Sequence, residues 1–128
     1  NPAPAGFCYS GDMSKRSAGA IAEGMVVGYL EQQGWRIVGR NLHYRFGEID
    51  ILADLGQELV VVEVKAKRNQ AQGAAVEMVT VAKQHTLRKL AHWVQVEYNK
   101  PVRIDVVTID GYGTPQPRIT HYPFAVGE

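Results

Sequence analysis

The stretch from Gly47 to Lys65 constrains the fold of this 128-residue chain more than any other. It contains two runs of β-branched and aliphatic residues, Ile49 to Leu52 and Leu59 to Val64, on either side of the turn-like sequence DLGQ. Short apolar runs of this composition around a turn are typical of two paired strands. The stretch therefore predicts an antiparallel hairpin.

Three charged side chains interrupt the apolar runs of this hairpin: Asp50, Glu63 and Lys65. Because side chains alternate along a strand, Glu63 and Lys65 point to the same face. The position of Asp50 depends on the register of the hairpin. A turn centred between Gly56 and Gln57 sets Asp50 opposite Glu63, and a turn centred one residue earlier also leaves Asp50 on that face. A turn centred on Gly56 itself puts Asp50 on the other face.

Two carboxylates that are close together in an apolar hairpin resist joint ionisation unless a cation accompanies them. Lys65 is one candidate for that cation. A hard divalent metal, which takes oxygen ligands and keeps several waters, is another. A structural ion pair at a sheet edge explains the same residues without a ligand, so the hairpin alone leaves both interpretations open.

Composition narrows the class of protein. The content of hydrophobic residues (45%) and charged residues (21%) is that of an ordinary globular domain, and the net charge of +1 means that any nucleic-acid surface must be local. A single cysteine, Cys8, excludes an internal disulfide framework and fits a reducing compartment. No apolar run approaches a membrane span. We expect a cytoplasmic protein with no membrane segment, a flexible leader over residues 1–15 and one domain over residues 16–128.

Helical periodicity precedes the hairpin. Ser17 is a candidate N-cap for a helix over residues 18–33 that ends at Gly34. Within it, Glu23 lies at the head of an apolar stripe that continues through Val26 and Leu30. Glu23 either reaches solvent at the border of this stripe or is delivered by it to the acids of the hairpin.

Basic residues lie on both sides of the hairpin. Arg40 lies near the end of a strand predicted over residues 35–42, and Arg45 lies just past it. Both stand close to aromatic residues, a mixture that can contact phosphates and stack on bases. Pairing of these arginines with nearby acids is the alternative. Lys67 and Arg68 belong to a polar loop predicted over residues 66–73, where they would either meet a phosphate backbone or simply be solvated.

The rest of the chain predicts a second helix over residues 79–98 and strands over residues 102–109 and 118–124. Lys83 lies on the inward face near the start of that helix, where the helix dipole disfavours a cation, so it predicts an anionic neighbour. Together these elements predict an α/β fold with a central mixed sheet of about five strands flanked by helices.

The order of these motifs resembles that of a known superfamily. Glu23 on a helix, then GEID ending at Asp50, then VEVK with Glu63 and Lys65, then a helix opening with Lys83 and Gln84, is similar to the PD-(D/E)XK restriction-endonuclease-like superfamily. More closely it resembles the YraN-like family of small bacterial proteins, which are regarded as predicted endonucleases and are related to archaeal-type Holliday junction resolvases. The resemblance spans residues 17–122. It departs from the superfamily pattern in one place and from the family pattern in another: Ile49 precedes Asp50 where the superfamily name has proline, and Ala66 stands where YraN-like sequences usually have threonine.

The resemblance implies roles for individual residues. Asp50 and Glu63 would be ligands of Mg²⁺ or Mn²⁺ together with the backbone carbonyl of Val64, and Glu23 would complete the acidic cluster. Lys65 would orient the attacking water or stabilise charge on the phosphate. Lys83 or Gln84 would match a polar residue of the resolvase-like members.

Two functional hypotheses follow from these residues. The first is a divalent-metal-dependent endonuclease that cleaves DNA phosphodiesters and selects for DNA structure, because a domain of this size has little room for base readout. The second is a nucleic-acid-binding or protein-interaction module that keeps the nuclease fold without turnover. A resolvase role predicts a homodimer with two-fold symmetry, and no residue of the sequence decides that point.

Overall fold

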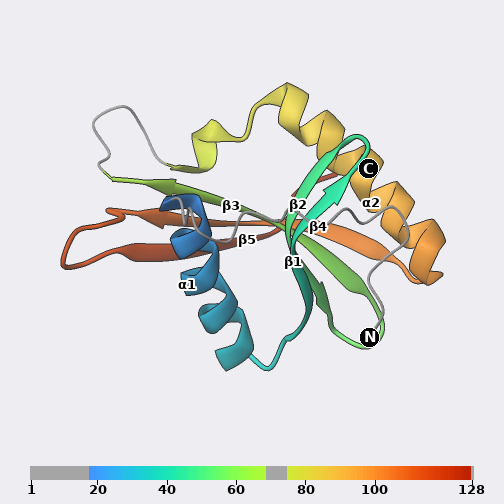
Figure 1. Cartoon of the computed structure of the whole chain (residues 1–128), viewed down its shortest axis with the longest axis horizontal. Helices are drawn as coiled ribbons and strands as arrows, with labels where there is room; N and C mark the ends of the chain where they lie inside the picture. The colour runs from blue at the N-terminus through green and yellow to red at the C-terminus, as the bar shows by residue number, and fades with distance from the viewer. Residues whose placement is uncertain (1–17, 69–74, 128) are drawn as a thin grey trace.

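The computed structural model describes residues 18–68 and 75–127 of the chain as one sheet with two α-helices (Figure 1). Adjacent strands are antiparallel except for the third and fourth, which are parallel. This is the predicted mixed α/β sheet. In sequence order, which is also their order across the sheet, the strands are β1 (Arg36–Tyr44), β2 (Gly47–Asp54), β3 (Leu59–Lys67), β4 (Val102–Asp110) and β5 (Arg118–Val126).

The two α-helices pack on opposite faces of the sheet and create two separate buried clusters. Helix α1 (Ala18–Gln32) contributes Ala22, Val26 and Leu30 to one cluster, and helix α2 (Val81–Tyr98) contributes Leu87, Leu90, Ala91 and Val94 to the other. Helix α2 also provides the crossover between the parallel strands. Among the described residues, no helix has both the length and the apolar character that crossing a membrane requires.

Strand β3 lies at the centre of the sheet and explains the continuous apolar run in the sequence. Leu59 and Val61 belong to the cluster under α2, whereas Val60 and Val62 belong to the cluster under α1. A strand that is covered on both faces needs apolar residues at every position. Glu63 is the first residue of β3 that breaks this requirement.

The hairpin register is one of the two that keep Asp50 on the Glu63 face. Asp54 pairs with Leu59 and Ile51 with Val62, which centres the turn between Gly56 and Gln57. The turn is closed by the Leu55 amide, which donates to the Glu58 carbonyl at 2.9 Å.

Several element boundaries differ from the sequence prediction. Ala66 and Lys67 were expected in a loop, but they extend β3 because they pair with Ile109 and Asp110 of β4. Helix α2 begins at Val81 rather than at residue 79, since the side chain of Thr80 caps it and accepts the Lys83 amide. An unpredicted 3₁₀-helix, η1 (Ala75–Met78), precedes it. The leader, the Ser17 cap and residues 69–73 of the predicted loop lie outside the described residues.

The two edge strands are longer than predicted. Strand β1 continues to Tyr44, and β5 continues past Pro123 to Val126. An edge strand tolerates proline because one of its sides has no partner to which an amide could donate. The ladder between β4 and β5 is irregular here, and Phe124 adopts φ +52°.

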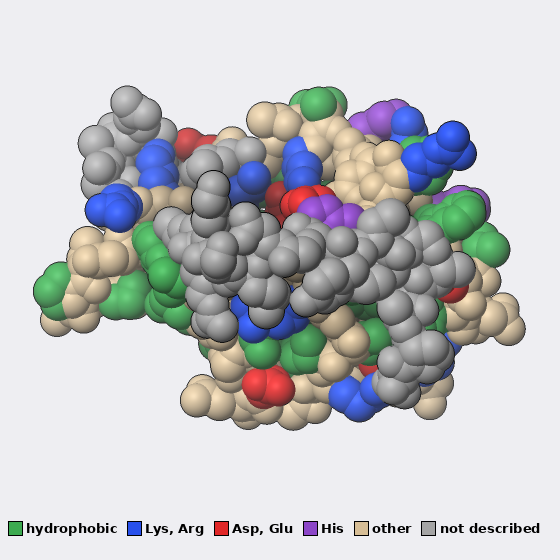
Figure 2. Space-filling model, in the orientation of Figure 1, with side chains coloured by type: hydrophobic (Ala, Val, Ile, Leu, Met, Phe, Trp, Pro, Cys, Tyr) green, Lys and Arg blue, Asp and Glu red, His purple; other side chains and the backbone are tan. Residues whose placement is uncertain are grey.

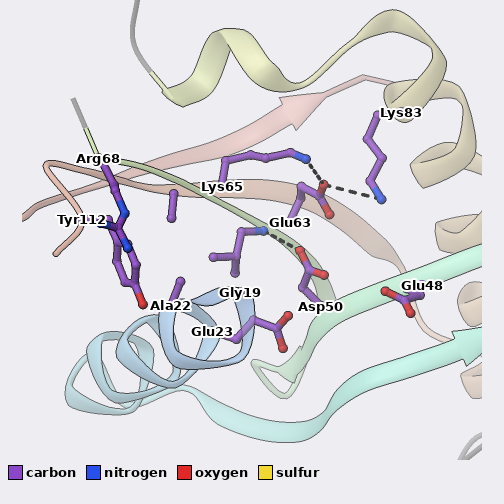
Figure 3. A pocket seen from close by; sticks show the side chains of 12 residues that line it. Gly19, Ala22, Glu23, Glu48, Asp50, Glu63, Lys65, Arg68, Lys83 and Tyr112 are labelled. Atoms are coloured by element: carbon purple, nitrogen blue, oxygen red, sulfur yellow. Dashed lines mark hydrogen bonds and ion pairs between the residues drawn. The ribbon is translucent and has the colours of Figure 1, made fainter. Parts of the chain in front are cut away.

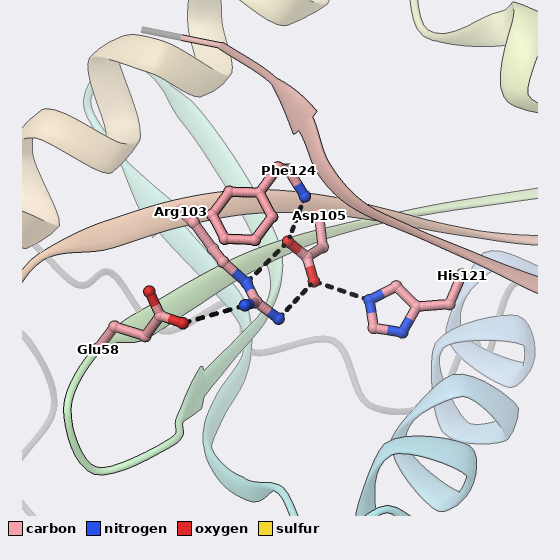
Figure 4. Close-up of polar contacts among 5 residues, drawn as sticks. All are labelled: Glu58, Arg103, Asp105, His121 and Phe124. Atoms are coloured by element: carbon pink, nitrogen blue, oxygen red, sulfur yellow. Dashed lines mark hydrogen bonds and ion pairs between the residues drawn. The ribbon is translucent and has the colours of Figure 1, made fainter.

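A buried carboxylate, Asp105 of β4, anchors this end of β5 (Figure 4). The Arg103 guanidinium donates to both of its oxygens, at 3.1 and 3.2 Å, and the Phe124 amide donates to Oδ1 at 3.0 Å. His121 Nε2 lies 2.7 Å from Oδ2. Glu58 accepts the remaining arm of Arg103 at 3.0 Å. A buried carboxylate with this many donors is a structural hub.

We expect Asp105→Ala to destabilise the protein by about 3–5 kcal/mol, because it leaves the Arg103 charge without its buried partner. Urea unfolding measures this change in free energy. The matched control is Arg36→Ala, which removes an ion pair with Asp54 from an arginine that is 56% exposed and is expected to cost less than about 1 kcal/mol. Equal losses in the two variants would contradict the assignment of Asp105 as a hub.

Candidate active site

The candidate site forms where β2 and β3 part. Their ladder ends at the pair Ile51 and Val62, and just beyond it the Asp50 side chain accepts a hydrogen bond from the Val64 amide at 2.8 Å. Ile51 packs in the cluster under α1, whereas Ile49 packs in the cluster under α2. Residues two apart in a regular strand share a face, so the strand changes its facing at Asp50. Asp50 thus lies where side chains from the two faces of the sheet can come together.

The parting of the strands opens a pocket of about 460 Å³ that both helices reach (Figure 3). Side chains from α1, from α2 and from the strands point into it. Its lining residues are Gly19, Ala22, Glu23, Glu48, Asp50, Glu63, Val64, Lys65, Ala66, Arg68, Lys83 and Tyr112. Seven of the predicted site residues are therefore brought together: Glu23, Asp50, Glu63, Val64, Lys65, Arg68 and Lys83.

Glu63 is the most deeply buried ionisable group of the pocket, with 2% of its surface exposed. Its Oε2 lies 3.5 Å from Lys65 Nζ and 3.6 Å from Lys83 Nζ. The anionic neighbour predicted for Lys83 is thus Glu63, which α2 meets from the face opposite α1. Figure 3 shows both ammonium groups pointing at the same carboxylate.

The electrostatics of the site disfavour its negative charges. Burial, followed by the adjacent carboxyl group of Asp50, raises the pKa of Glu63 to about 8, although Lys83 and Lys65 oppose the shift. Burial and Asp50 likewise raise the pKa of Glu23 to about 7, against the effect of Arg40. Carboxyl groups with pKa values raised by burial and by a like-charged neighbour are typical of functional sites.

The donor set fits a hard divalent cation. Oε1 of Glu23 and Oε1 of Glu63 are buried, and neither has a hydrogen-bond partner in the described part of the chain. Such oxygens are costly to bury unless a cation compensates them. Within residues 18–68 and 75–127, no three His, Cys, Asp or Glu side chains converge on a single point. Buried carboxylate oxygens without a partner are the ligand type that Mg²⁺ takes, because this ion typically binds one or two carboxylates and keeps several waters.

The predicted nucleic-acid residues are only partly gathered at the pocket. Arg68 lines it, as Tyr112 does (Figure 3). Arg40 does not line it, but donates to the Ala20 carbonyl at 3.3 Å. Arg45 is exposed in the turn between β1 and β2, and Lys67 is part of β3; neither lines the pocket.

Of the lining residues that were not predicted as site residues, two have polar side chains, Glu48 and Tyr112. Glu48 accepts a hydrogen bond from His43 Nδ1 at 2.9 Å. Because it belongs to the GEID motif together with Asp50, its position in the sequence could have identified it as a residue of the pocket. Tyr112 follows β4 in a turn, and its amide donates to the Lys67 carbonyl at 2.9 Å. Tyr112 reaches the pocket because β4 pairs with β3, and no local sequence pattern reveals this pairing.

Comparisons with known proteins identify the family. The family described as "Uncharacterised protein family UPF0102" matches residues 22–109. A UPF0102 protein of Arthrobacter sp. (strain FB24) is 43% identical over 111 residues, covering 84% of this chain and 94% of the relative. One of Vibrio campbellii is 40% identical over 108 residues, covering 80% and 88%. The chain belongs to the UPF0102 family, the YraN-like family that its motifs predicted.

One solved structure, titled "Structure of EndoMS-dsDNA2 complex", aligns with a TM-score of 0.44 and 19% sequence identity. The alignment covers 75% of this chain and 38% of the other. A similarity of this extent says nothing about the activity of the present chain.

The raised pKa of Glu63 predicts how stability depends on pH without metal. A glutamate of the unfolded chain titrates near 4.5, so between about pH 4.5 and pH 8 the folded protein holds a proton that the unfolded chain has released. The free energy of unfolding therefore falls as pH rises through this window. We expect Glu63→Gln to flatten the profile and to be more stable than the wild type above pH 8, in urea unfolding with a chelator present.

The control for this experiment is Glu31→Gln, which changes an exposed glutamate of α1 and should keep the wild-type slope. Parallel profiles for the wild type and Glu63→Gln would show that Glu63 does not titrate in this window.

Proposed function

We propose that the protein is a divalent-metal-dependent endonuclease that hydrolyses DNA phosphodiesters. The observation that carries the proposal is the Glu63 carboxylate, which is almost fully buried beside Asp50 and keeps one oxygen without a partner. A purely structural ion pair would be expected to satisfy both oxygens. The unpartnered oxygen of Glu63 can still bind a cation, and this supports the proposal of a metal site.

Asp50, Glu63 and the Val64 carbonyl are the groups that would hold Mg²⁺ or Mn²⁺ in this proposal. When bound, such an ion polarises a phosphodiester and lowers the pKa of a coordinated water. Glu23 reaches the same pocket from α1 and adds a carboxylate to its wall. Glu23 would complete the acidic cluster around the ion.

Lys65 and Lys83 supply positive charge from two different elements, β3 and α2. Both lie within 4 Å of the same Glu63 oxygen, so both can turn toward a phosphate at the mouth of the pocket. Lys65 would counter the charge that develops on the phosphate during attack, a contribution worth roughly 10²- to 10³-fold in rate. Arg68 would position a flanking phosphate.

DNA is the substrate class that we favour, with selection for structure rather than for sequence. The net charge of +1 provides no general attraction for a polyanion, so binding must come from local groups such as Arg68, Lys65 and Lys83. Branched or nicked DNA offers exposed phosphates and unstacked bases to a small domain of this kind.

The test is a titration of Mg²⁺ and Mn²⁺ into the wild type and Asp50→Ala, with cleavage of labelled branched, nicked and single-stranded DNA measured in parallel. We expect saturable metal binding and cleavage in the wild type. Both should be lost in Asp50→Ala, with a fall in rate of roughly 10²-fold or more because a ligand is removed. Lys65→Ala should keep metal binding and lose roughly 10²- to 10³-fold in rate.

Glu31→Gln is again the matched control, since it removes an exposed acid outside the pocket and should change neither quantity. Metal binding and DNA binding without cleavage of any substrate would favour the alternative, a binding module on the same fold. Failure of both ions to bind would make the cluster a structural ion-pair network and sink the enzyme proposal.

A further inference from the structure

The outer face of α2 carries an exposed stripe that the proposed active site does not use. His85, Lys89, His92 and Val96 recur along the helix at i, i+4, i+7 and i+11, and all four are exposed. Residues with this spacing lie on one side of a helix. Figure 2 shows histidine, basic and hydrophobic side chains gathered at the upper right, where α2 lies in Figure 1.

Two aromatic rings stand beside this stripe. Trp93 follows His92 on α2 and is 42% exposed, and Phe46 at the tip of the β1–β2 hairpin is 51% exposed. Their ring centroids are 6.4 Å apart, with the planes at 75°. Single exposed aromatic residues are common, but two rings in contact with each other on the surface form a local apolar patch.

The packing of the hairpin tip against α2 holds the two rings together. Gly47 follows Phe46 with φ +151°, and a Cβ at this position would lie 3.0 Å from the Thr86 methyl group on α2. The close approach of backbone to helix therefore requires glycine. It places Phe46 over the middle of α2 rather than free in solvent.

The exposed side of α2 carries basic side chains and no acidic one among the described residues. Helix α2 contains a single acid, Glu97, and both of its carboxylate oxygens are buried. Lys89 and two histidines share the outer side of α2 with Trp93, and Arg45 precedes Phe46 in the hairpin turn. This charge is complementary to a polyanion. A second copy of the chain is disfavoured, because an isologous contact would set the same cations against one another.

We propose that Phe46, Trp93, Lys89 and His92 form a stacking platform for single-stranded nucleic acid that leads toward the candidate active site. Aromatic rings beside cations are the means by which proteins hold single strands without reading their sequence. Lys83 of the pocket and Trp93 lie ten residues apart on the same helix, about 15 Å along its axis. A short unpaired segment can span that distance.

This platform deepens the proposed function and rests on it for the arrival of nucleic acid at the pocket, but its binding is measured separately. The probe is a labelled oligothymidylate, titrated by fluorescence anisotropy in a chelator so that no cleavage occurs. A duplex of the same length is the comparison probe. We expect the single strand to bind more tightly and to quench tryptophan emission.

Variants locate the binding. The double variant Phe46→Ala with Trp93→Ala should bind oligothymidylate roughly 5- to 100-fold more weakly, because it removes two stacking rings. Trp93→Phe keeps an aromatic ring and should bind nearly as well, but with most of the quenching lost. Ile21→Ala, which shortens an exposed aliphatic side chain of α1 outside this face, is the matched control and should leave binding unchanged. Lys89→Ala should reduce the salt dependence by about one unit of slope.

The outcomes separate the two proposals. Wild-type affinity in the double alanine variant would overturn the platform, whether or not the protein cleaves DNA. A wild-type protein that self-associates, and that becomes monomeric in the double variant by sedimentation, would overturn it in favour of a contact between copies. Loss of oligothymidylate binding in the double variant, from a wild type that never cleaves DNA, would support the platform and reject the nuclease.

Discussion

The burial of the Glu63 carboxylate on the central strand is the constraint on which the site depends. An ionised carboxylate inside an apolar sheet is costly, and the neighbouring Asp50 increases the cost. The protein meets part of it with the two ammonium groups of Lys65 and Lys83 at 3.5 and 3.6 Å. It meets the rest by protonation when no cation is bound, as the raised pKa of Glu63 indicates. In the function that we propose, a metal ion would take the place of this proton.

The geometry of the sheet makes this arrangement possible. Helices α1 and α2 pack on opposite faces, so Glu23 and Lys83 would be separated by the sheet if it were continuous. The ladder between β2 and β3 stops at Ile51 and Val62, and the side chain of Asp50 binds the Val64 amide beyond it. This break is the place where groups from both faces meet in one pocket.

The sequence predicted the direction of individual site residues better than it predicted how these residues come together in one pocket. Alternation along β3 placed Glu63 and Lys65 together, and helical spacing pointed Lys83 inward, because these are local periodicities. The same spacing put Glu23 at the head of an apolar stripe but left open whether it reached solvent or the acids of the hairpin. Nothing local indicated that α1 and α2 cover opposite faces, or that β2 changes its facing at Asp50. The extension of β3 to Lys67 depends on the distant strand β4, and the position of Phe46 against Trp93 depends on how the hairpin tip packs on α2. Local periodicity does not predict tertiary contacts of this kind.

Two buried carboxylates in the same sheet show how structure and function can be told apart. Asp105 is fully buried, and each of its oxygens has two nitrogen partners, from Arg103, Phe124 and His121. Glu63 is almost equally buried, yet one of its oxygens has no partner in the described residues and the other meets only flexible lysine ends. A carboxylate kept for stability tends to saturate its hydrogen bonds, since each unmet bond costs free energy. A carboxylate kept for binding must leave capacity unused. Asp105 therefore holds the sheet together, whereas Glu63, which has an unpartnered oxygen and lies in the pocket beside Asp50, is the carboxylate to which we assign the proposed cation.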